Sequence, residues 1–316
     1  MLVTRKGEDL YTAVASSELN CTLPTFPEIS NDKIMKLVGI YQCNNRVYVQ
    51  GLKLLSGQYD LLVLENKETW TDVEFPGVFE KEGTDTEYHV APGDDNKLYI
   101  RESAILESTE TNIWAFDCVK HANGGNSKGA AWEKLDFTVE GHNMDARDGL
   151  MCVSRDKLAI IDDKNANYKV RIYDLTKTSS SALLATIGLD GFSIFSPHSI
   201  TCKDGKAYVY ARKDSTRKKK IIVINMDNDP NPPKMENQIE LPSSYGNGET
   251  SIAVVNGMVT LAGGNVREDG SSGYRDAENL LILADNGTWV EGAPFKAHEI
   301  RKIYFQGVLT LPISYL

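Results

Sequence analysis

Long hydrophobic runs are missing from this sequence. No stretch of 18 apolar residues occurs, and no charged-then-apolar leader is found around Met1–Arg5. A membrane-spanning helix and a signal peptide are therefore not expected. We predict a cytoplasmic protein, or a secreted one whose leader has been removed, with no membrane partner.

Motifs that bind nucleotides or activate a nucleophile are missing too. The chain holds no G-x-x-x-x-G-K-[ST] loop, no dinucleotide glycine fingerprint and no G-x-S-x-G turn. Each of these motifs places backbone amides or a nucleophile where the chemistry requires them. Their absence disfavours an ATPase, a dehydrogenase and an α/β-hydrolase.

Cysteine is scarce and scattered. The five cysteines are an odd number, and no two of them form a C-x-x-C pair. Disulfide scaffolds and zinc ribbons rely on close, regular cysteine spacing. We expect buried free thiols rather than a disulfide framework or a structural zinc site.

The charge balance is acidic. The 316 residues carry a formal net charge of −10, with 41% hydrophobic and 25% charged residues. This composition is typical of a soluble globular protein with a substantial core. Because an acidic surface repels phosphate backbones, nucleic acid is not an expected partner.

What the chain does contain is one short pattern repeated six times. A polar turn leads into a compact apolar strand, at a period of about 50 residues. The copies centre on Val47, Leu98, Leu158, Ala207, Val259 and Leu309. Self-similarity at this period indicates radially repeated β-sheets, so the predicted fold class is an all-β propeller with six four-stranded blades.

Each repeat divides into four strands, named a to d from the axis outward. The repeated pattern is strand b, and Asn44-Asn45, Asp204-Gly205 and Asn256-Gly257 provide positive-φ residues for the a-to-b turns. Strands c, rich in β-branched and aromatic residues, are expected at 59–65, 112–117, 169–174, 220–225, 279–284 and 9–14. Strands d are expected at 70–75, 132–137, 183–187, 238–241, 289–294 and 21–26.

The two termini each supply part of a repeat. The last copy ends after strand b, whereas the first residues supply only outer strands. Joining them completes one blade, closes the ring and removes exposed sheet edges. The prediction is one domain, 1–316, with blade 1 at 1–27 plus 296–316, and blades 2 to 6 at 32–76, 85–137, 146–188, 196–242 and 248–294.

Three features recur in parts of the repeat: a double glycine after strand b, an aromatic–acidic pair in c and a tryptophan opening d. The matching residues are Leu64-Glu65 to Trp70, Phe116-Asp117 to Trp132, Tyr173-Asp174, and Gly263-Gly264 followed by Trp289. The chain thus resembles kelch-like propellers, which implies a module that mediates protein contacts. Arg46–Gln50 is also similar to a strand of six-bladed fungal fucose-binding lectins.

The long b-to-c connections point to a working surface. In a four-stranded blade these connections and the d-to-a links emerge at one end of the ring, here named the loop face. The tight a-to-b turns lie at the other end, the turn face. Binding usually resides in long polar loops on a rigid scaffold. Candidate binding residues on the loop face are Lys218, Lys219, Lys220, Arg267 and Arg275.

Three histidines are expected near the loop-face start of inner strands. His89, His198 and His298 precede strand b at similar distances in blades 3, 5 and 1. Neutral imidazoles converging on the axis would hold a divalent metal with open positions. Alternatively, they fill the channel mouth or point between blades. No cofactor is predicted, and a divalent metal at these three histidines stays open.

Carboxylates at neighbouring inner-strand positions complete the candidate list. Asp148, Glu249 and Glu299 would act with the histidines as acids or bases, or form a solvated rim. The leading functional hypothesis is a binding module that holds a protein or small-molecule ligand on the loop face. The alternatives are an enzyme, such as a metal-dependent lyase or isomerase, with its pocket at the channel mouth, and a carbohydrate-binding lectin.

Overall fold

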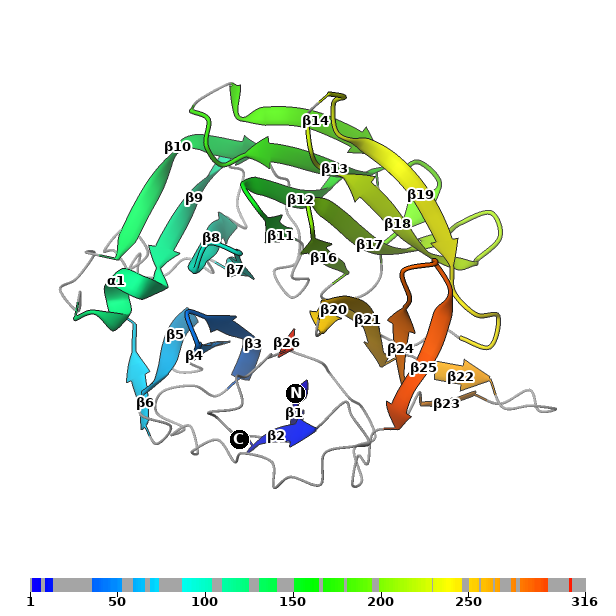
Figure 1. The fold of residues 1–316 in the computed structure, drawn as a ribbon, viewed down its shortest axis with the longest axis horizontal. Coiled ribbons are helices and arrows are strands. Elements are labelled where there is room, and N and C mark those ends of the chain that lie inside the picture. The colour runs from blue at the N-terminus through cyan, green and yellow to red at the C-terminus, as the bar shows by residue number, and fades with distance from the viewer. Residues whose placement is uncertain are drawn as a thin grey trace.

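The chain folds into antiparallel sheets arranged around a common centre (Figure 1). The computed structural model describes residues 2–6, 9–13, 36–52, 59–65, 69–73, 87–103, 110–124, 131–140, 151–164, 167–178, 181–194, 199–228, 230–245, 250–255, 257–263, 265–267, 274–276, 279–294 and 307–308. In five of the sheets described, the strands follow one another in chain order from the centre outward, as in a β-propeller.

Five blades with four strand positions each are present among the described residues. Blade 2 contains β3 (Lys36–Cys43), β4 (Arg46–Leu52), β5 (Tyr59–Glu65) and β6 (Thr69–Asp72), and blade 3 contains β7 (Glu87–Pro92), β8 (Lys97–Ser103), β9 (Glu110–Asp117) and β10 (Trp132–Glu140). Blade 4 contains β11 (Met151–Ser154), β12 (Lys157–Lys164), β13 (Asn167–Asp174) and β14 (Leu183–Gly188).

The inner strand of blade 5 is in two pieces. Both β15 (Phe192–Ser193) and β16 (Ile200–Lys203) pair with β17. The blade continues through β17 (Lys206–Lys213), β18 (Lys219–Asn225) and β19 (Lys234–Glu240). Blade 6 contains β20 (Thr250–Val255), β21 (Met258–Gly263), β24 (Asn279–Leu283) and β25 (Trp289–Pro294), and a separate hairpin of β22 (Asn265–Arg267) and β23 (Tyr274–Asp276) stands between β21 and β24.

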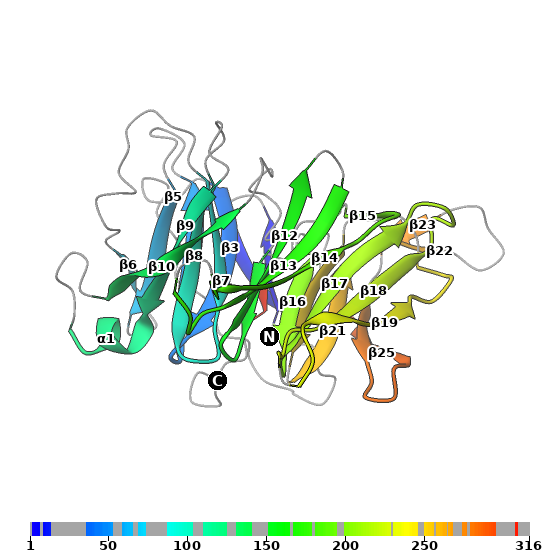
Figure 2. The ribbon, with the colours of Figure 1, turned by 90° about the horizontal axis from the view of Figure 1, so that it is seen from above.

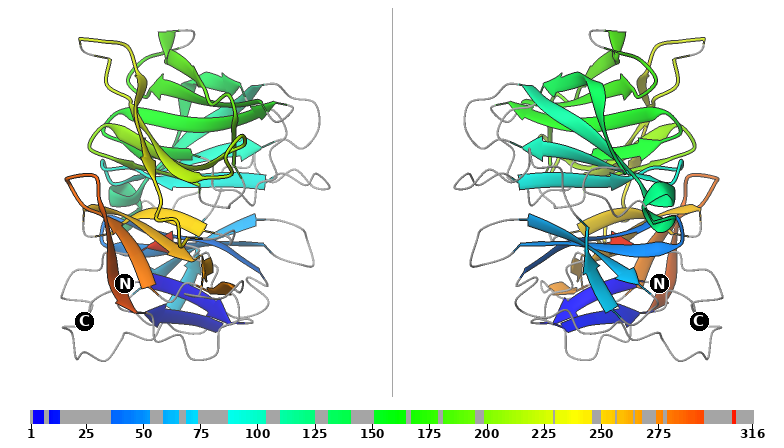
Figure 3. Two further views of the ribbon diagram at one scale, coloured as in Figure 1. Left: turned by 90° about the vertical axis from the view of Figure 1, so that its right-hand side faces the viewer. Right: turned by 90° about the vertical axis from the view of Figure 1, so that its left-hand side faces the viewer.

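The two chain ends share one further sheet. It has the order β2 (Asp9–Ala13), β1 (Leu2–Lys6), β26 (Gly307–Val308), and it lies between blades 2 and 6 (Figures 1 and 3). Ring closure by both termini is therefore seen. The predicted count of six four-stranded blades is not confirmed, because this sheet is described with three strands only and the strand expected at 21–26 lies outside the described residues.

One strand assignment at the closure was wrong. The prediction placed 9–14 beside the C-terminal strand, whereas Leu2–Lys6 occupies that position and Asp9–Ala13 lies one strand further out. The physical reason is that these two segments form a tight hairpin, with Lys6 opposite Asp9. The hairpin then adds to the sheet through its first strand.

The core lies in the seams, the interfaces between neighbouring blades. Strand β12 shows why: Leu158, Ala159, Ile160 and Ile161 are all fully buried, so both faces of the sheet are covered. Continuous apolar runs of this kind are expected where a sheet packs on both sides. Separate apolar clusters fill seams 2–3, 3–4, 4–5 and 5–6.

The a-to-b turns use the residues that the sequence suggested. Asn44 and Asn45 have φ of 45° and 56°, and Asp204 and Gly205 have φ of 51° and 75°. Gly257 has φ of 73°, while Asn256 lies outside the described residues. These left-handed conformations match the right-handed twist of the flanking strands and keep the hairpins tight.

A short helix interrupts blade 3 between strands c and d. Helix α1 (Cys118–Ala122) begins after Asp117, whose carboxylate accepts hydrogen bonds from the amides of Val119 and Lys120 at 3.0 and 2.9 Å. This is N-terminal capping. Figure 2 shows α1 at the turn-face end of the strands, with β22 and β23 toward the opposite end.

Candidate functional site

The basic run of blade 5, residues 212–220, lies at the loop face, in the hairpin that joins β17 to β18. The side chains of Lys218, Lys219 and Lys220 point in alternate directions, since side chains alternate along a strand. The ammonium groups of Lys218 and Lys220 approach the carboxylate of Glu240 on β19 at 2.9 and 3.5 Å. These two lysines are therefore part of an ion-pair ladder on one face of their own blade.

Lys219 points to the opposite face of blade 5. It shares that face with Ile221 and Val223, which pack in seam 5–6. Its Nζ is shielded from solvent and has no hydrogen-bond partner among the described residues. Burial, reinforced by the positive charge of Arg212, lowers the pKa of Lys219 to about 8.

The groups around Lys219 come from three elements. Arg212 lies directly opposite it in the β17–β18 register. On the same face of β17, Tyr210 hydrogen-bonds with Thr250 of β20, and burial raises the pKa of Tyr210 to about 12. Tyr245, which follows β19, is buried in the same seam. The loop-face end of seam 5–6 therefore places two cations above aromatic side chains.

A second polar cluster is buried in seam 3–4. Arg171 Nε and Nη2 each donate to Asp162 Oδ2 at 3.0 Å, and the Asp162 side chain is only 2% exposed. Arg101 of the neighbouring blade donates from Nε to Thr111 Oγ1 at 3.0 Å. Burial lowers the pKa of Arg101, and the charge of Asp162 across the seam raises it.

His89 belongs to the surroundings of this cluster. It lies opposite Arg101 in the β7–β8 register and is buried. Since Ala91 two residues on packs against blade 4, alternation directs the His89 imidazole into seam 3–4. Of the three predicted interpretations of His89, this geometry fits the one that placed it between blades.

The remaining candidate residues are only partly visible. His198, His298, Asp148, Glu249 and Glu299 lie outside the described residues. Arg267 and Arg275 lie on β22 and β23, the hairpin between strands b and c of blade 6. Within the described part of the chain no three histidine, cysteine or acidic side chains are grouped as metal ligands, so convergence of the histidines stays a prediction.

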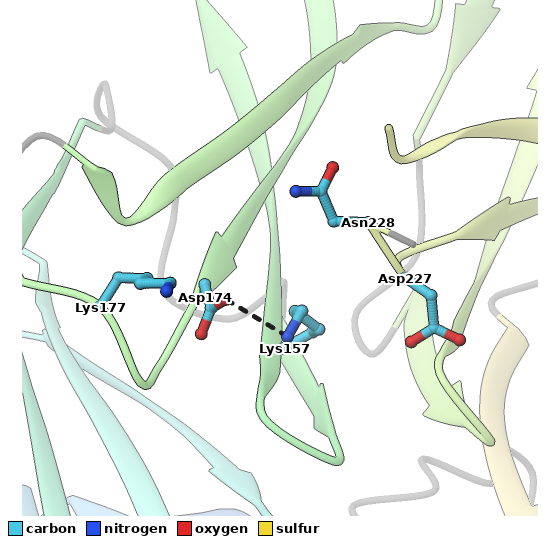
Figure 4. A pocket seen from close by; sticks show the side chains of 5 residues that line it. All are labelled: Lys157, Asp174, Lys177, Asp227 and Asn228. Atoms are coloured by element: carbon cyan, nitrogen blue, oxygen red, sulfur yellow. Dashed lines mark ion pairs between the residues drawn. The ribbon is translucent and has the colours of Figure 1, made fainter. Parts of the chain in front are cut away.

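A cavity of about 450 Å³ lies at the turn face between blades 4 and 5. Lys157, Asp174 and Lys177 line it from blade 4, and Asp227 and Asn228 face them from blade 5 (Figure 4). Lys157 Nζ pairs with Asp174 at 3.4 Å, and Asp227 accepts from Arg155 Nη1 at 3.1 Å. Most of the charged groups that line the cavity are therefore already in ion pairs.

Hydrogen bonds connect three successive blades along the turn face. Asp94 Oδ2 of blade 3 accepts from the Arg155 amide at 2.8 Å and from Ser154 Oγ at 3.1 Å. Ser154 Oγ in turn accepts from the Gly205 amide of blade 5 at 3.2 Å. This chain of contacts fixes the a-to-b turns relative to one another.

Two disulfides overturn the prediction of free thiols. Cys43 of β3 is joined to Cys118 of α1, and Cys152 of β11 is joined to Cys202 of β16. Their Cα atoms are 6.1 and 5.4 Å apart, within the usual range for a disulfide. Partners 75 and 50 residues apart meet because each bond crosses a seam between successive repeats.

Comparisons with known proteins identify the fold alone. No family model matches the chain, and no curated protein matches it. Similar solved structures include a chain of the nidogen–laminin complex, with a TM-score of 0.52, 11% identity and coverage of 96% of this chain and 95% of that one. The kelch resemblance therefore stays a prediction, whereas the propeller fold is shown.

Two further structures are similar at lower scores. TolB from Acinetobacter baumannii has a TM-score of 0.46 and 12% identity over 82% of this chain, which spans 53% of the TolB chain. The propeller domain of the Trilobed protease from Pyrococcus furiosus has a TM-score of 0.41 and 12% identity, covering 70% of this chain and 69% of that domain. Among the described residues, no helix is long and apolar enough to cross a membrane.

Proposed function

We propose that this propeller is a binding module whose loop face receives a protein partner through an acidic segment. The observation that carries the proposal is the position of cations on blade 5. On a chain of net charge −10, Arg212, Lys213, Arg217 and Lys219 lie together at the β17–β18 hairpin. A local basic site on an acidic protein attracts acidic groups and orients them.

The scaffold suits this role. The hairpin is held by a backbone bond from the Lys213 amide to the Lys218 carbonyl at 2.8 Å, so its tip is presented on a rigid sheet. The nidogen–laminin complex contains a similar propeller chain in a protein complex, which motivates a protein as the partner. The interblade disulfides favour an oxidising compartment for this encounter.

The test uses a fluorescent octa-glutamate peptide as the probe, titrated at low ionic strength. The loop-face variant K213Q/R217N removes one half-buried and one exposed charge, and asparagine tolerates the positive φ of Arg217. The matched control K177Q/K234Q removes two exposed lysines at the turn face. Both variants have the same net charge.

We expect the loop-face variant to bind the peptide about threefold to tenfold more weakly, since each partly exposed charge contact contributes up to ~1 kcal/mol. The turn-face control should retain wild-type affinity. Equal weakening in both variants would reduce the effect to net charge and reject the loop face as the binding surface. Absence of binding by the wild type would reject the acidic partner.

A further inference from the structure

Two positive side chains end the β17–β18 ladder directly opposite each other. Arg212 and Lys219 form the last residue pair of the register, and both are half-buried on the side of seam 5–6. Like charges at directly opposed positions destabilise a sheet. The ammonium of Lys219 beside the Arg212 guanidinium therefore costs stability unless an anion reaches it.

The carboxylate that β19 contributes beside this hairpin serves the other face of the blade. Glu240 pairs with Lys218 and Lys220, whose side chains alternate away from Lys219. Lys219 Nζ itself has no hydrogen-bond partner in the described part of the chain. A shielded ammonium without an acceptor is unusual, because buried charges in proteins are normally paired.

The surroundings would strengthen binding of an anion. Tyr210, Tyr245 and Ile252 are buried below the pair in seam 5–6. Charge–charge attraction grows as the local dielectric falls, so an oxyanion reaching Lys219 here would be held more firmly than at an exposed lysine. Arg212 offers a planar guanidinium suited to carboxylate, sulfate or phosphate oxygens.

We propose that the loop-face end of seam 5–6 binds an oxyanion between Lys219 and Arg212. This inference rests on the proposed function and names the contact within it: the site takes a carboxylate of the acidic partner or, in its absence, a free inorganic anion. The shared chemistry is a negatively charged oxygen pair that completes the hydrogen bonding of Lys219.

Inorganic sulfate is the probe that tests the site without any partner. The melting temperature is followed during titration with sodium sulfate and, at equal ionic strength, with sodium chloride. K219M removes the ammonium and keeps an apolar stem of similar length. K218M is the matched control, because it removes one charge from the adjacent residue on the opposite face. K219R keeps a cation at the site.

We expect a sulfate-specific rise in melting temperature for the wild type, K218M and, in weaker form, K219R. K219M should bind sulfate about tenfold or more weakly, the usual loss for a charge-assisted hydrogen bond. Sulfate stabilises folded proteins in general, so only the part of the response that K219M lacks is assigned to the site. A sulfate response of equal size in K219M and the wild type would overturn the inference, as would a loss of the response in K218M.

The experiments can reject either of the two proposals without rejecting the other. If sulfate has no Lys219-dependent effect while the acidic peptide still requires Lys213 and Arg217, the oxyanion site is wrong and the loop-face function remains. If sulfate binds through Lys219 but the peptide shows no loop-face dependence, the site remains and the acidic partner is wrong. Peptide binding by K219M then shows whether a partner carboxylate or only a free anion uses the site.

Discussion

Cys152 and Cys202 stand at the ends of one repeat and are joined across seam 4–5. They are separated by 50 residues in the sequence, and their Cα atoms lie 5.4 Å apart. Each is on the inner strand of its blade, β11 and β16. The disulfide therefore ties together equivalent positions of two successive blades, close to the centre of the ring.

We expect loss of this bond to destabilise the ring. The double variant C152S/C202S should lower the free energy of unfolding by about 3 kcal/mol, because the unfolded chain regains the entropy of a long open loop. Urea denaturation measures the change. C21S is the control, since Cys21 belongs to neither bond, and it should change stability little. A double variant as stable as the control would contradict a structural role for the disulfide.

A thiol count tests both bonds at once. Four of the five cysteines are paired. The denatured, unreduced protein should therefore react with one equivalent of a thiol reagent, and the reduced protein with five. Three or five equivalents before reduction would show that at least one disulfide is absent.

The repeat predicted most of the strands but not these bonds. Strand limits at Tyr59–Glu65, a strand c, and Trp289–Pro294, a strand d, agree residue for residue, because strands bounded by turns leave little freedom in where they begin and end. The cysteines were treated as isolated residues instead of positions within the repeat. Applying the 50-residue period to Cys152 would have placed Cys202 on the adjacent inner strand.

The candidate site was predicted less well, for a physical reason. The sequence shows a basic run but does not show in which direction each side chain points. Alternation along β18 separates Lys218 and Lys220 from Lys219. The approach of Arg101 to Asp162 was not predicted, because contacts across a seam depend on how neighbouring blades pack. A charged residue inside an otherwise apolar strand was the available signal.

The buried ion pair in seam 3–4 should be essential for stability. In D162N the guanidinium of Arg171 loses the carboxylate that accepts its two hydrogen bonds. Breaking a buried pair leaves an uncompensated charge, so we expect a loss of about 3 kcal/mol in urea denaturation. The control is E65Q, which breaks the half-exposed pair between Arg46 and Glu65 at 4.0 Å and should cost less than about 1 kcal/mol. Similar losses in both variants would contradict the burial argument.

Lys219 should make stability depend on pH in the alkaline range. Its pKa is lowered from 10.5 to about 8 in the folded protein, by burial and by Arg212, with Tyr210 and Tyr245 also packed in the seam. Between these values the unfolded chain binds more protons than the folded protein. The destabilisation caused by burying the charged Lys219 ammonium is therefore relieved as pH rises from about 8 to 10.5. A fully buried group would contribute about 3 kcal/mol. Its partial exposure reduces this to roughly 1 kcal/mol.

The measurement is the difference in unfolding free energy between the wild type and K219M at several pH values. In the absence of sulfate, the unfolding free energy of the wild type should rise relative to that of K219M as pH increases from 8 to 10.5. Taking the difference removes the titration of tyrosines common to both proteins. A difference that stays constant with pH would show that the Lys219 amine titrates as in the unfolded chain.

Arg155 is the first residue of its a-to-b turn, a position that Asn44 fills in blade 2 and Asp204 in blade 5. Its φ is 55°, against 45° and 51° at those two residues, and its guanidinium pairs with Asp227 across seam 4–5. Because this pair is 56% and 39% exposed, its loss should cost under about 1 kcal/mol. R155N keeps a residue that tolerates positive φ, so we expect thermal unfolding close to that of the wild type.

R155V separates the backbone effect from the ion pair. R155V also lacks the contact with Asp227. In addition, the branched valine side chain crowds the left-handed conformation at this turn, which should lower the free energy of unfolding by about 1–2 kcal/mol more. The amide that donates to Asp94 would shift with the turn and weaken the link to blade 3. Equal melting temperatures for R155N and R155V would mean that the turn relaxes out of positive φ, and that the Asp94 contact does not hold it there.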